Sequence, residues 1–287
     1  MDEGTAEAMQ DYLAWLKRRN RSDKTIATYR TALASCIRFF GERGMETDPR
    51  RIGEDEIVAL MNGYPASETT VHYYTKTLGQ FLAWAGNRTV QDMGLLWNEE
   101  THPHARWITP DEFAAVTDAI LDPTDRIIIM LAAYAGMRRS EIARLLQCDI
   151  LSDRMIVTGK GHGKGKQRII PLTDRLRAEI GRYMAYRRRY VADTDVPALV
   201  VSFPTGKAAT GMAAGTVGKR LRRVCERAGV DASAHSFRRY FATRIWDTMP
   251  DKDIKVLQSL LGHSSPAVTS RYIRTDAEAM AEAMSRL

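Results

Sequence analysis

Apolar side chains recur at helical spacing in three stretches of residues 1–92, and a shorter apolar segment lies between the second and the third. Spacings of three and four residues put side chains on one face of an α-helix. Ser22 and Ser67 stand where helix N-caps are expected, and Gly41 and Gly86 where helices end. Residues 1–92 are therefore predicted to form a four-helix domain. The stretches are Met9, Tyr12, Leu13 and Leu16; Ile26, Tyr29, Leu33, Ile37 and Phe40; and Val71, Tyr74, Leu78, Phe81 and Leu82, with Ile57 to Met61 as the shorter segment.

The pattern is lost over residues 93–106, which have mixed polarity, no sustained period and a proline, as is typical of a linker. Helical spacing returns in residues 107–287. Pro110 and Pro123 stand at helix starts, and the apolar body of the second helix ends at Gly136. A third helix is expected around Ile142, Leu145 and Leu146.

The strand signals lie in the middle of this second domain. Met155 to Thr158 and Arg168 to Pro171 flank a loop rich in glycine and lysine, which predicts an antiparallel hairpin. Residues 196–203 are read as a short strand or irregular segment, and helices are expected from Gly215 onward. The fold class predicted is mainly α with one small antiparallel β-sheet (α+β).

The composition is that of an ordinary globular protein, with 44% hydrophobic and 27% charged residues in a chain of 287. The longest apolar run, Ile127 to Gly136, is too short to cross a membrane, and the acidic start Met1-Asp2-Glu3 is unlike a signal peptide. A cytoplasmic protein is expected. The three cysteines are widely spaced, so we expect reduced core thiols rather than disulfides. No histidine has a second metal-type ligand at helix spacing, and no metal is expected.

The net charge of +7 is unevenly distributed. Residues 1–92 carry 12 Lys and Arg against 13 Asp and Glu, and the excess lies wholly in the remainder of the chain. Residues 154–189 alone hold 11 basic residues against Asp174 and Glu179. A strongly basic segment favours a polyanionic partner, nucleic acid first, although a solvated basic face is an equal alternative.

Two arginine motifs could form an anion site. Arg138 follows a glycine turn, with Glu141 three residues on to orient it, and a guanidinium matches two phosphate oxygens at once. His235 and Arg238 share a helix face at the same spacing. Each motif is weak alone, because such pairs also occur by chance or as surface ion pairs.

Further candidate chemistry lies on the hairpin and near the carboxyl end. Lys160 closes the first strand and could give a proton to a leaving oxygen, whereas Lys164 and Lys166 are read as phosphate contacts on a solvated loop. Gly262 and His263 form a turn before a helix that carries Tyr272. A lone helical tyrosine is usually a packing residue.

Taken in order, Arg138, Lys160, His235, Arg238, His263 and Tyr272 resemble the active-site series of the tyrosine recombinases, the phage-integrase family with its Xer-like site-specific recombinases. The resemblance covers nearly the whole chain. It implies a helical SAM-like core-binding domain followed by a tyrosine-recombinase catalytic domain, with double-stranded DNA as partner, self-association from dimer to tetramer on DNA, and neither metal, ATP nor other cofactor.

The resemblance also implies a role for each residue. Tyr272 would attack a DNA phosphodiester and form a 3′-phosphotyrosyl bond, and Lys160 would protonate the leaving 5′ oxygen. Arg138 and Arg238 would clamp the non-bridging oxygens, with His235 and His263 as hydrogen-bond donors or proton carriers and Glu141 as support. Lys164, Lys166, Arg168 and Arg239 are further expected DNA contacts; Arg239 stands where many members have histidine.

Two other functions fit the same sequence less well. A topoisomerase of type IB would use similar chemistry on DNA as a monomer, but the recombinase-like helical N-terminal domain argues against it. A non-catalytic DNA-binding accessory protein would be expected to lack at least one of the six residues, and all six are present.

Overall fold

The computed structural model describes residues 3–95, 107–159, 166–191, 195–203, 207–263 and 265–270. The chain divides into two compact units, Met1–Pro103 and His104–Leu287, and the point of division lies inside the segment 93–106 that the sequence marks as a linker. Each unit is described by itself. Within the described ranges the chain is mainly helical with small antiparallel sheets, so the predicted fold class is confirmed.

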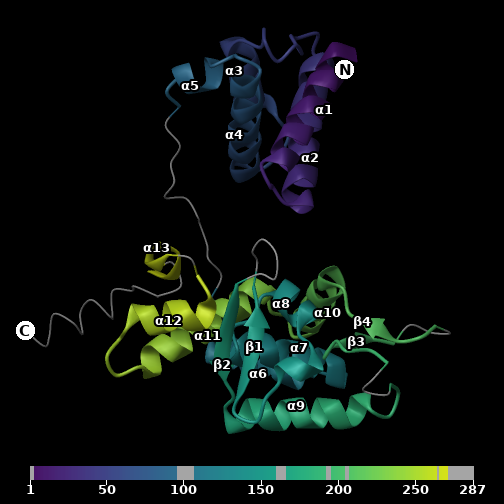
Figure 1. Ribbon diagram of the computed structural model, residues 1–287. Coiled ribbons are helices and arrows are strands. Elements are labelled where there is room, and N and C mark those ends of the chain that lie inside the picture. Colours follow the sequence, from purple (N-terminus) through teal and green to yellow (C-terminus); the bar gives the residue numbers. More distant parts are fainter. Residues whose placement is uncertain are drawn as a thin grey trace, which may run out of the picture. The chain divides into compact units, whose positions relative to one another are not determined.

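The first unit contains the four predicted helices and one further turn of helix (Figure 1). Ser22 caps the second helix by accepting a hydrogen bond from the backbone N–H of Thr25 at 3.1 Å. The apolar faces meet in one core, where the ring of Tyr12 lies 5.2 Å from that of Phe81 and 5.5 Å from that of Trp84. The helices are α1 (Glu3–Arg18), α2 (Asp23–Gly41), α3 (Glu54–Gly63), α4 (Glu68–Trp84) and the short α5 (Thr89–Asp92).

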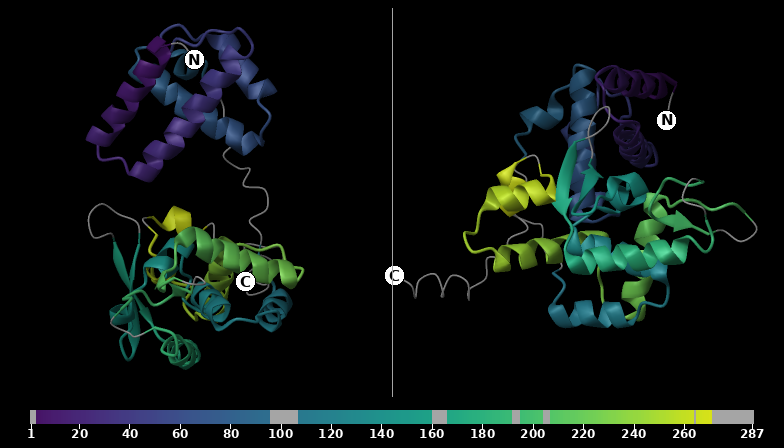
Figure 2. Two further views of the ribbon diagram at one scale, coloured as in Figure 1. Left: turned by 90° about the vertical axis from the view of Figure 1, so that its right-hand side faces the viewer. Right: turned by 60° about the horizontal axis from the view of Figure 1, so that its bottom comes forward.

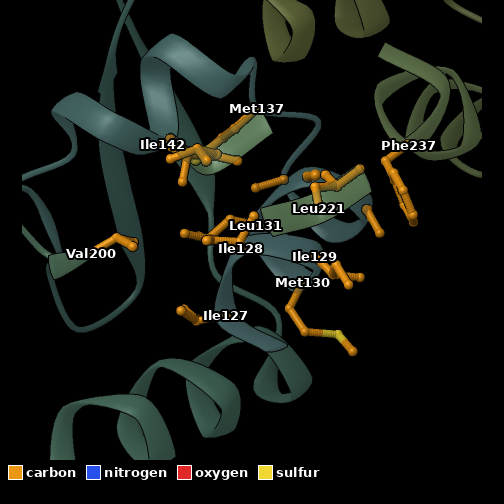
Figure 3. Close-up of a cluster of buried hydrophobic side chains, with 14 of the residues drawn as sticks. Ile127, Ile128, Ile129, Met130, Leu131, Met137, Ile142, Val200, Leu221 and Phe237 are labelled. Atoms are coloured by element: carbon orange, nitrogen blue, oxygen red, sulfur yellow. The ribbon is translucent and has the colours of Figure 1, made fainter. Parts of the chain in front are cut away.

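The second unit is built around α7 (Pro123–Tyr134), whose residues from Thr124 to Ala133 are nearly all buried. A helix that is apolar on every side has to be surrounded, and side chains of several elements pack around it (Figure 3). The other helices are α6 (Pro110–Asp118), α8 (Arg139–Arg144), α9 (Asp174–Arg187), α10 (Ala214–Arg227), α11 (Ala234–Thr248), α12 (Ile254–Leu261) and α13 (Pro266–Ser270), with a 3₁₀ turn at Gln147–Asp149.

Helix α8 is shorter than the apolar pattern suggested. It ends at Arg144, and Leu145 has extended backbone angles. The carbonyl of Leu145 accepts a hydrogen bond from the N–H of Leu199 at 2.7 Å, and Leu146 forms a β-bridge to Ala198. These residues therefore pair with a distant segment, and this tertiary pairing replaces the predicted last turn.

Two small antiparallel sheets lie in this unit, where one was predicted. The predicted hairpin is β1 (Arg154–Thr158) paired with β2 (Gln167–Pro171), with Val157 opposite Arg168, and it stands at the margin of the unit (Figure 2). The second sheet pairs β3 (Val201–Ser202) with β4 (Thr210–Gly211). β3 lies inside the segment 196–203 that the sequence indicates as a short strand or irregular segment. β4 was not predicted, because a strand of two residues is too short for period-two alternation to reveal it.

The cysteines differ in part from expectation. Cys36 and Cys225 are buried thiols, but Cys148 is exposed because it lies in the 3₁₀ turn at the surface. Among the described residues, no three His, Cys, Asp or Glu side chains are grouped so as to hold a metal ion. No helix in those same ranges has the length and apolar character that crossing a membrane requires.

Gly136, which follows α7, allows a direct test of this packing. Its φ is +57°, and a Cβ placed there would lie 2.4 Å from Cδ1 of Phe241. We expect Gly136→Ala to lower the free energy of unfolding by about 3 kcal/mol, since it combines backbone strain with a steric clash. Urea denaturation measures this change.

Gly229 supplies the matched control, because its φ is +67° and no heavy atom lies within 4 Å of a Cβ built on it. Gly229→Ala is expected to cost only about 1 kcal/mol, from backbone strain alone. Equal losses in the two variants would contradict the close packing of Phe241 on Gly136.

Candidate active site

The site begins at the turn between α7 and α8. Gly136 adopts the left-handed conformation, and Arg138 follows as the N-cap residue of α8 with extended backbone angles. Glu141, in the first turn of α8, accepts two hydrogen bonds from Arg138, one from the backbone N–H and one from Nη1, each at 2.8 Å. The sequence spacing of three residues thus fixes the direction of the Arg138 guanidinium, whose side chain is 30% exposed.

Glu141 also binds two arginines from distant parts of the chain. Arg168 on β2 donates from Nη1 to Oε1 at 3.0 Å and from Nη2 to Oε2 at 2.8 Å. Nη1 of Arg238 lies 3.8 Å from Oε2. Burial would raise the pKa of Glu141, but the hydrogen bonds and charge of Arg168, the N–H of Arg138 and the charge of Arg238 outweigh it and lower the pKa to about 2. Glu141 is therefore a buried, permanently charged centre.

Arg238 comes from α11 and is fully buried. It donates from Nη1 to the carbonyl of Gly136 and from Nη2 to the carbonyl of Leu261, the last residue of α12. A single guanidinium thus ties the α7–α8 turn to the end of α12, although 102 positions separate Arg238 from Gly136.

His263 lies directly after α12. Gly262 ends that helix in the left-handed conformation with φ of +64°, and the N–H of His263 donates to the carbonyl of Gln258 at 3.2 Å. The side chain of His263 is buried, and its Nδ1 lies 3.0 Å from Oγ1 of Thr269 on α13. The turn and the short helix together hold the imidazole in place.

Both histidines are held in the neutral form. Burial, followed by the charges of Arg238, Arg138 and Arg168, lowers the pKa of His263 to about 3. His235, the second residue of α11, is more exposed, but partial desolvation of its ring and the charges of Arg239, Arg238 and Arg138 lower its pKa to about 4. The causes of these shifts show that Arg138, His235, Arg238 and His263 act on one another across one small region.

Arg168 differs from its expected place. It was read as a DNA contact, but its side chain is only 7% exposed, and its Nε donates to the carbonyl of Leu260 at 2.8 Å while its Nη atoms bind Glu141. Alternate residues of a strand share a face, and Arg168 shares that of the buried Ile170, whereas Ile169 between them is 58% exposed. Because isoleucine stands at both 169 and 170, the sequence does not indicate which face of the strand is buried.

Two further expected site residues, Arg239 and Lys166, lie within the described part of the chain. The guanidinium of Arg239 lies 5.9 Å from the ring centre of Trp107, and Lys166 is exposed at the start of the hairpin's returning arm. Lys160, Lys164 and Tyr272 lie outside the described residues. The last described residue before Lys160 is Gly159, whose N–H donates to the carbonyl of Lys166 at 2.8 Å and on which a Cβ would lie 3.8 Å from Oε1 of Glu141.

Sequence reasoning missed two contributors to this arrangement. Thr269 is the hydroxyl partner of His263, and the carbonyls of Leu260 and Leu261 accept hydrogen bonds from Arg168 and Arg238. Carbonyls in the last turn of a helix have no intrahelical partner, so arginine side chains can bind them. The pattern of side chains in a sequence does not indicate which backbone carbonyls will accept a hydrogen bond from a distant arginine.

This arrangement suits an anion better than a cation. Arginines and neutral imidazoles offer donors to an oxyanion, and the only carboxylate in the cluster just described is already bound by arginine. A phosphodiester carries one negative charge on two non-bridging oxygens, which an arginine fork matches. The fold and the site together describe a protein that binds and can activate a phosphodiester.

Comparison with known proteins identifies the family. The model of the phage integrase family matches residues 106–279, more than half of the chain. The chain therefore belongs to the phage integrase family, the tyrosine recombinases, as its sequence predicted. The recombinase class of DNA-cleaving and rejoining enzymes is thereby confirmed.

Relatives and solved structures agree with this assignment. The chain is 27% identical to the tyrosine recombinase XerA of Pyrococcus furiosus, covering 98% of this chain and 94% of the relative. It is 28% identical to XerD of Corynebacterium glutamicum, covering 78% and 67%. A lambda integrase dimer bound to a COC′ core site has the same fold at 19% identity, with a TM-score of 0.68 and coverage of 95% and 96%.

The low histidine pKa values predict an early loss of stability on acidification. An unfolded histidine has a pKa near 6.5, whereas folded His263 has a pKa of about 3, so the unfolded state binds more protons between these values. The stability present above pH 6.5 is expected to fall as the pH drops, by about 1 kcal/mol per pH unit for His263. Urea denaturation at pH 7 and pH 5 measures the fall.

The variant His263→Asn should lose less stability than the wild type between these two pH values, because it removes the titrating group. The same pH dependence in His263→Asn and the wild type would refute a neutral, buried His263. Below pH 4.5, protonation of Glu141 adds to the loss, since its folded pKa is about 2 against 4.5 for an ordinary glutamate.

Proposed function

We propose that the protein is a site-specific DNA recombinase that cleaves and rejoins DNA through a 3′-phosphotyrosyl intermediate, with Tyr272 as the nucleophile. The observation that carries the proposal is that Arg138 and Arg238 meet at the buried Glu141, with His235 and His263 near enough for both arginine charges to act on them. These donors come from the α8 cap, α11 and the α12–α13 turn, and their chemistry matches a phosphodiester.

Each group has a task in the reaction. Arg138 and Arg238 stabilise the charge that develops on the non-bridging oxygens as the Tyr272 oxygen bonds to phosphorus. The phenol must lose its proton, and its ordinary pKa near 10 calls for a base. Burial and arginine charge make His235 and His263 weak bases in the free protein, and the negative charge of a bound phosphodiester would raise their pKa values and suit one of them to this role. The bond from phosphorus to the 5′ oxygen breaks, and Lys160 supplies that oxygen with a proton.

The tyrosine ester keeps the free energy of the phosphodiester bond, so reversal with a new 5′ hydroxyl rejoins the strand without ATP. The residues of this scheme supply charge, position and proton transfer. Arginine and histidine donors perform the charge stabilisation that a divalent cation performs in many other phosphoryl-transfer enzymes.

The partners follow from the chemistry and from the relatives. Lambda integrase has been solved as a dimer on a core site and as a tetramer on a Holliday junction, and XerH on its difH substrate. These complexes support double-stranded DNA as the substrate of this chain and assembly from dimer to tetramer on it. A cytoplasmic location stays a prediction. The exposed Lys166 and the half-buried Arg239, with Lys164, are proposed contacts to the DNA backbone.

The nucleophile is tested with nicked suicide duplexes made from the repeats that flank the gene. The wild type is expected to form a covalent protein–DNA adduct that survives denaturing electrophoresis, attached to a 3′ phosphate. Tyr272→Phe should bind the same duplexes with unchanged affinity and form no adduct, because only the attacking oxygen is removed. An adduct with Tyr272→Phe would exclude Tyr272 as the nucleophile.

The hairpin lysines are tested with the same duplexes. Lys160→Ala is expected to slow single-turnover cleavage by roughly 100-fold, the usual contribution of a general acid. Lys164→Ala and Lys166→Ala should instead weaken DNA binding and its salt dependence while the cleavage rate at saturating DNA stays close to that of the wild type. A 5′-thiolate leaving group needs no protonation, so it should restore cleavage by the variant that lacks the acid. If Lys164→Ala or Lys166→Ala instead cleaved slowly and the 5′-thiolate restored its cleavage rate, that lysine would be the general acid in place of Lys160.

A further inference from the structure

We propose that Arg168 is a positioning residue of this active site, which couples the base of the β1–β2 hairpin to Arg138 and to the turn that carries His263. The inference rests on the proposed function, because positioning has a meaning only for the groups that act on DNA. The proposal assigns a role to the buried guanidinium of Arg168, which takes no direct part in the proposed reaction.

The contacts of Arg168 reach both halves of the site. Two of its nitrogens bind the two oxygens of Glu141 at 3.0 and 2.8 Å, and the third, Nε, binds the carbonyl of Leu260 at 2.8 Å. Glu141 in turn binds Nη1 of Arg138 at 2.8 Å. Arg168 is therefore hydrogen-bonded directly both to the carboxylate that orients Arg138 and to the last turn of α12.

The two arginines at the end of α12 work as a pair. Arg168 holds the carbonyl of Leu260 and Arg238 holds that of Leu261, and both guanidinium groups lie at Glu141. His263 follows two residues after Leu261, so the position of the imidazole depends on how these carbonyls are held. A shift of β2 therefore moves Glu141 and the α12 end together.

Arg168 also has a fixed place in the hairpin. It lies opposite Val157 in the β1–β2 register, and the pair closest to the tip, Thr158 and Gln167, is its neighbour. The N–H of Gly159 donates to the carbonyl of Lys166, which closes the base of the loop in which Lys160 is the first residue. Arg168 thus lies two residues from the Gly159–Lys166 hydrogen bond, the last described contact of the hairpin before the proposed proton donor.

Only arginine fits this position. Its planar fork binds two carboxylate oxygens and a carbonyl in three directions, whereas a lysine ammonium is a single point charge on a flexible stem. The space is made by Gly262, since a Cβ there would lie 2.9 Å from Cδ of Arg168 and 3.3 Å from its Nη1. The glycine of the turn before His263 and the arginine of the hairpin are therefore matched to one another.

Arg168 is a positioning residue and not a catalytic one, because its side chain is only 7% exposed and each of its three nitrogens already donates a hydrogen bond. This burial leaves little of the guanidinium surface for a phosphate to contact. Its influence on the reaction must therefore pass through Arg138 and His263.

The test compares Arg168→Lys with Arg154→Lys on the suicide duplexes described above. Arg154 is the matched control, because it lies on the paired strand, is half exposed and meets only Asp153 at 3.8 Å. Arg168→Lys keeps the positive charge but loses the planar guanidinium that binds Glu141 and Leu260 at the same time. We expect single-turnover cleavage to slow by about 10- to 100-fold, as for a small misplacement of reacting groups, with the Kd for DNA within about threefold. Arg154→Lys should change neither.

A double-mutant cycle with Glu141→Gln separates positioning from a general structural effect. If Arg168 acts through Glu141, adding Arg168→Lys to Glu141→Gln should slow cleavage by less than about threefold beyond Glu141→Gln alone. Independent, fully multiplicative losses would overturn the coupling, as would a cleavage rate in Arg168→Lys equal to that of the wild type.

Hydrogen exchange without DNA tests the link to the turn. The amides of Gly262 and His263 donate to Ser259 and Gln258, and Arg168→Lys is expected to speed their exchange by about 10-fold while Arg154→Lys leaves it unchanged. Unchanged exchange in Arg168→Lys would overturn the inference whatever the DNA assays show. The absence of any adduct from the wild type would instead overturn the proposed function, so the two failures are distinct.

Discussion

The site depends on one buried carboxylate. Glu141 is almost without solvent contact, and a charge in that position is stable only if opposite charges and hydrogen bonds surround it. It meets guanidinium groups from the cap of α8, from β2 and from α11. Without the carboxylate these guanidinium groups would repel one another. Replacing Glu141 with a neutral side chain is therefore expected to destabilise the cluster. The elements that carry the three arginines are therefore held in register by electrostatics as much as by apolar packing.

Two left-handed turns make this cluster possible. At Gly136 the backbone turns so that its carbonyl faces Arg238, and at Gly262 it turns so that the side chain of Arg168 can pass close to the main chain. In each case a side chain on the turn would overlap a neighbour that the site needs, Phe241 in the first and Arg168 in the second. The two turns also end α7 and α12 shortly before Arg138 and His263. These candidate site residues are therefore positioned by helix ends and not by the middle of helices.

The electrostatics of the site suit its proposed substrate. Burial and arginine charge lower the pKa values of both histidines, and a bound phosphodiester would partly cancel that charge. The same imidazoles that are neutral in the free protein would then bind protons more readily once DNA is in place. In the proposed reaction, proton transfer would in this way be linked to substrate binding.

The sequence by itself determined the local features: the helices with a clear apolar period, the β1–β2 hairpin, and the pairs Arg138–Glu141 and His235–Arg238, whose members are three residues apart and so share a face. It also indicated the family, through the order of six residue types. Other features depended on contacts between distant segments. The early end of α8 follows from such contacts, and so does the inward position of Arg168, because isoleucines at both 169 and 170 leave the buried face of β2 undecided in the sequence. Only the tertiary structure decided that Glu141, Arg168, Arg238 and the carbonyls at the end of α12 meet. Periodicity specifies which face of an element is buried, whereas the partner that covers this face is set by how all elements pack together.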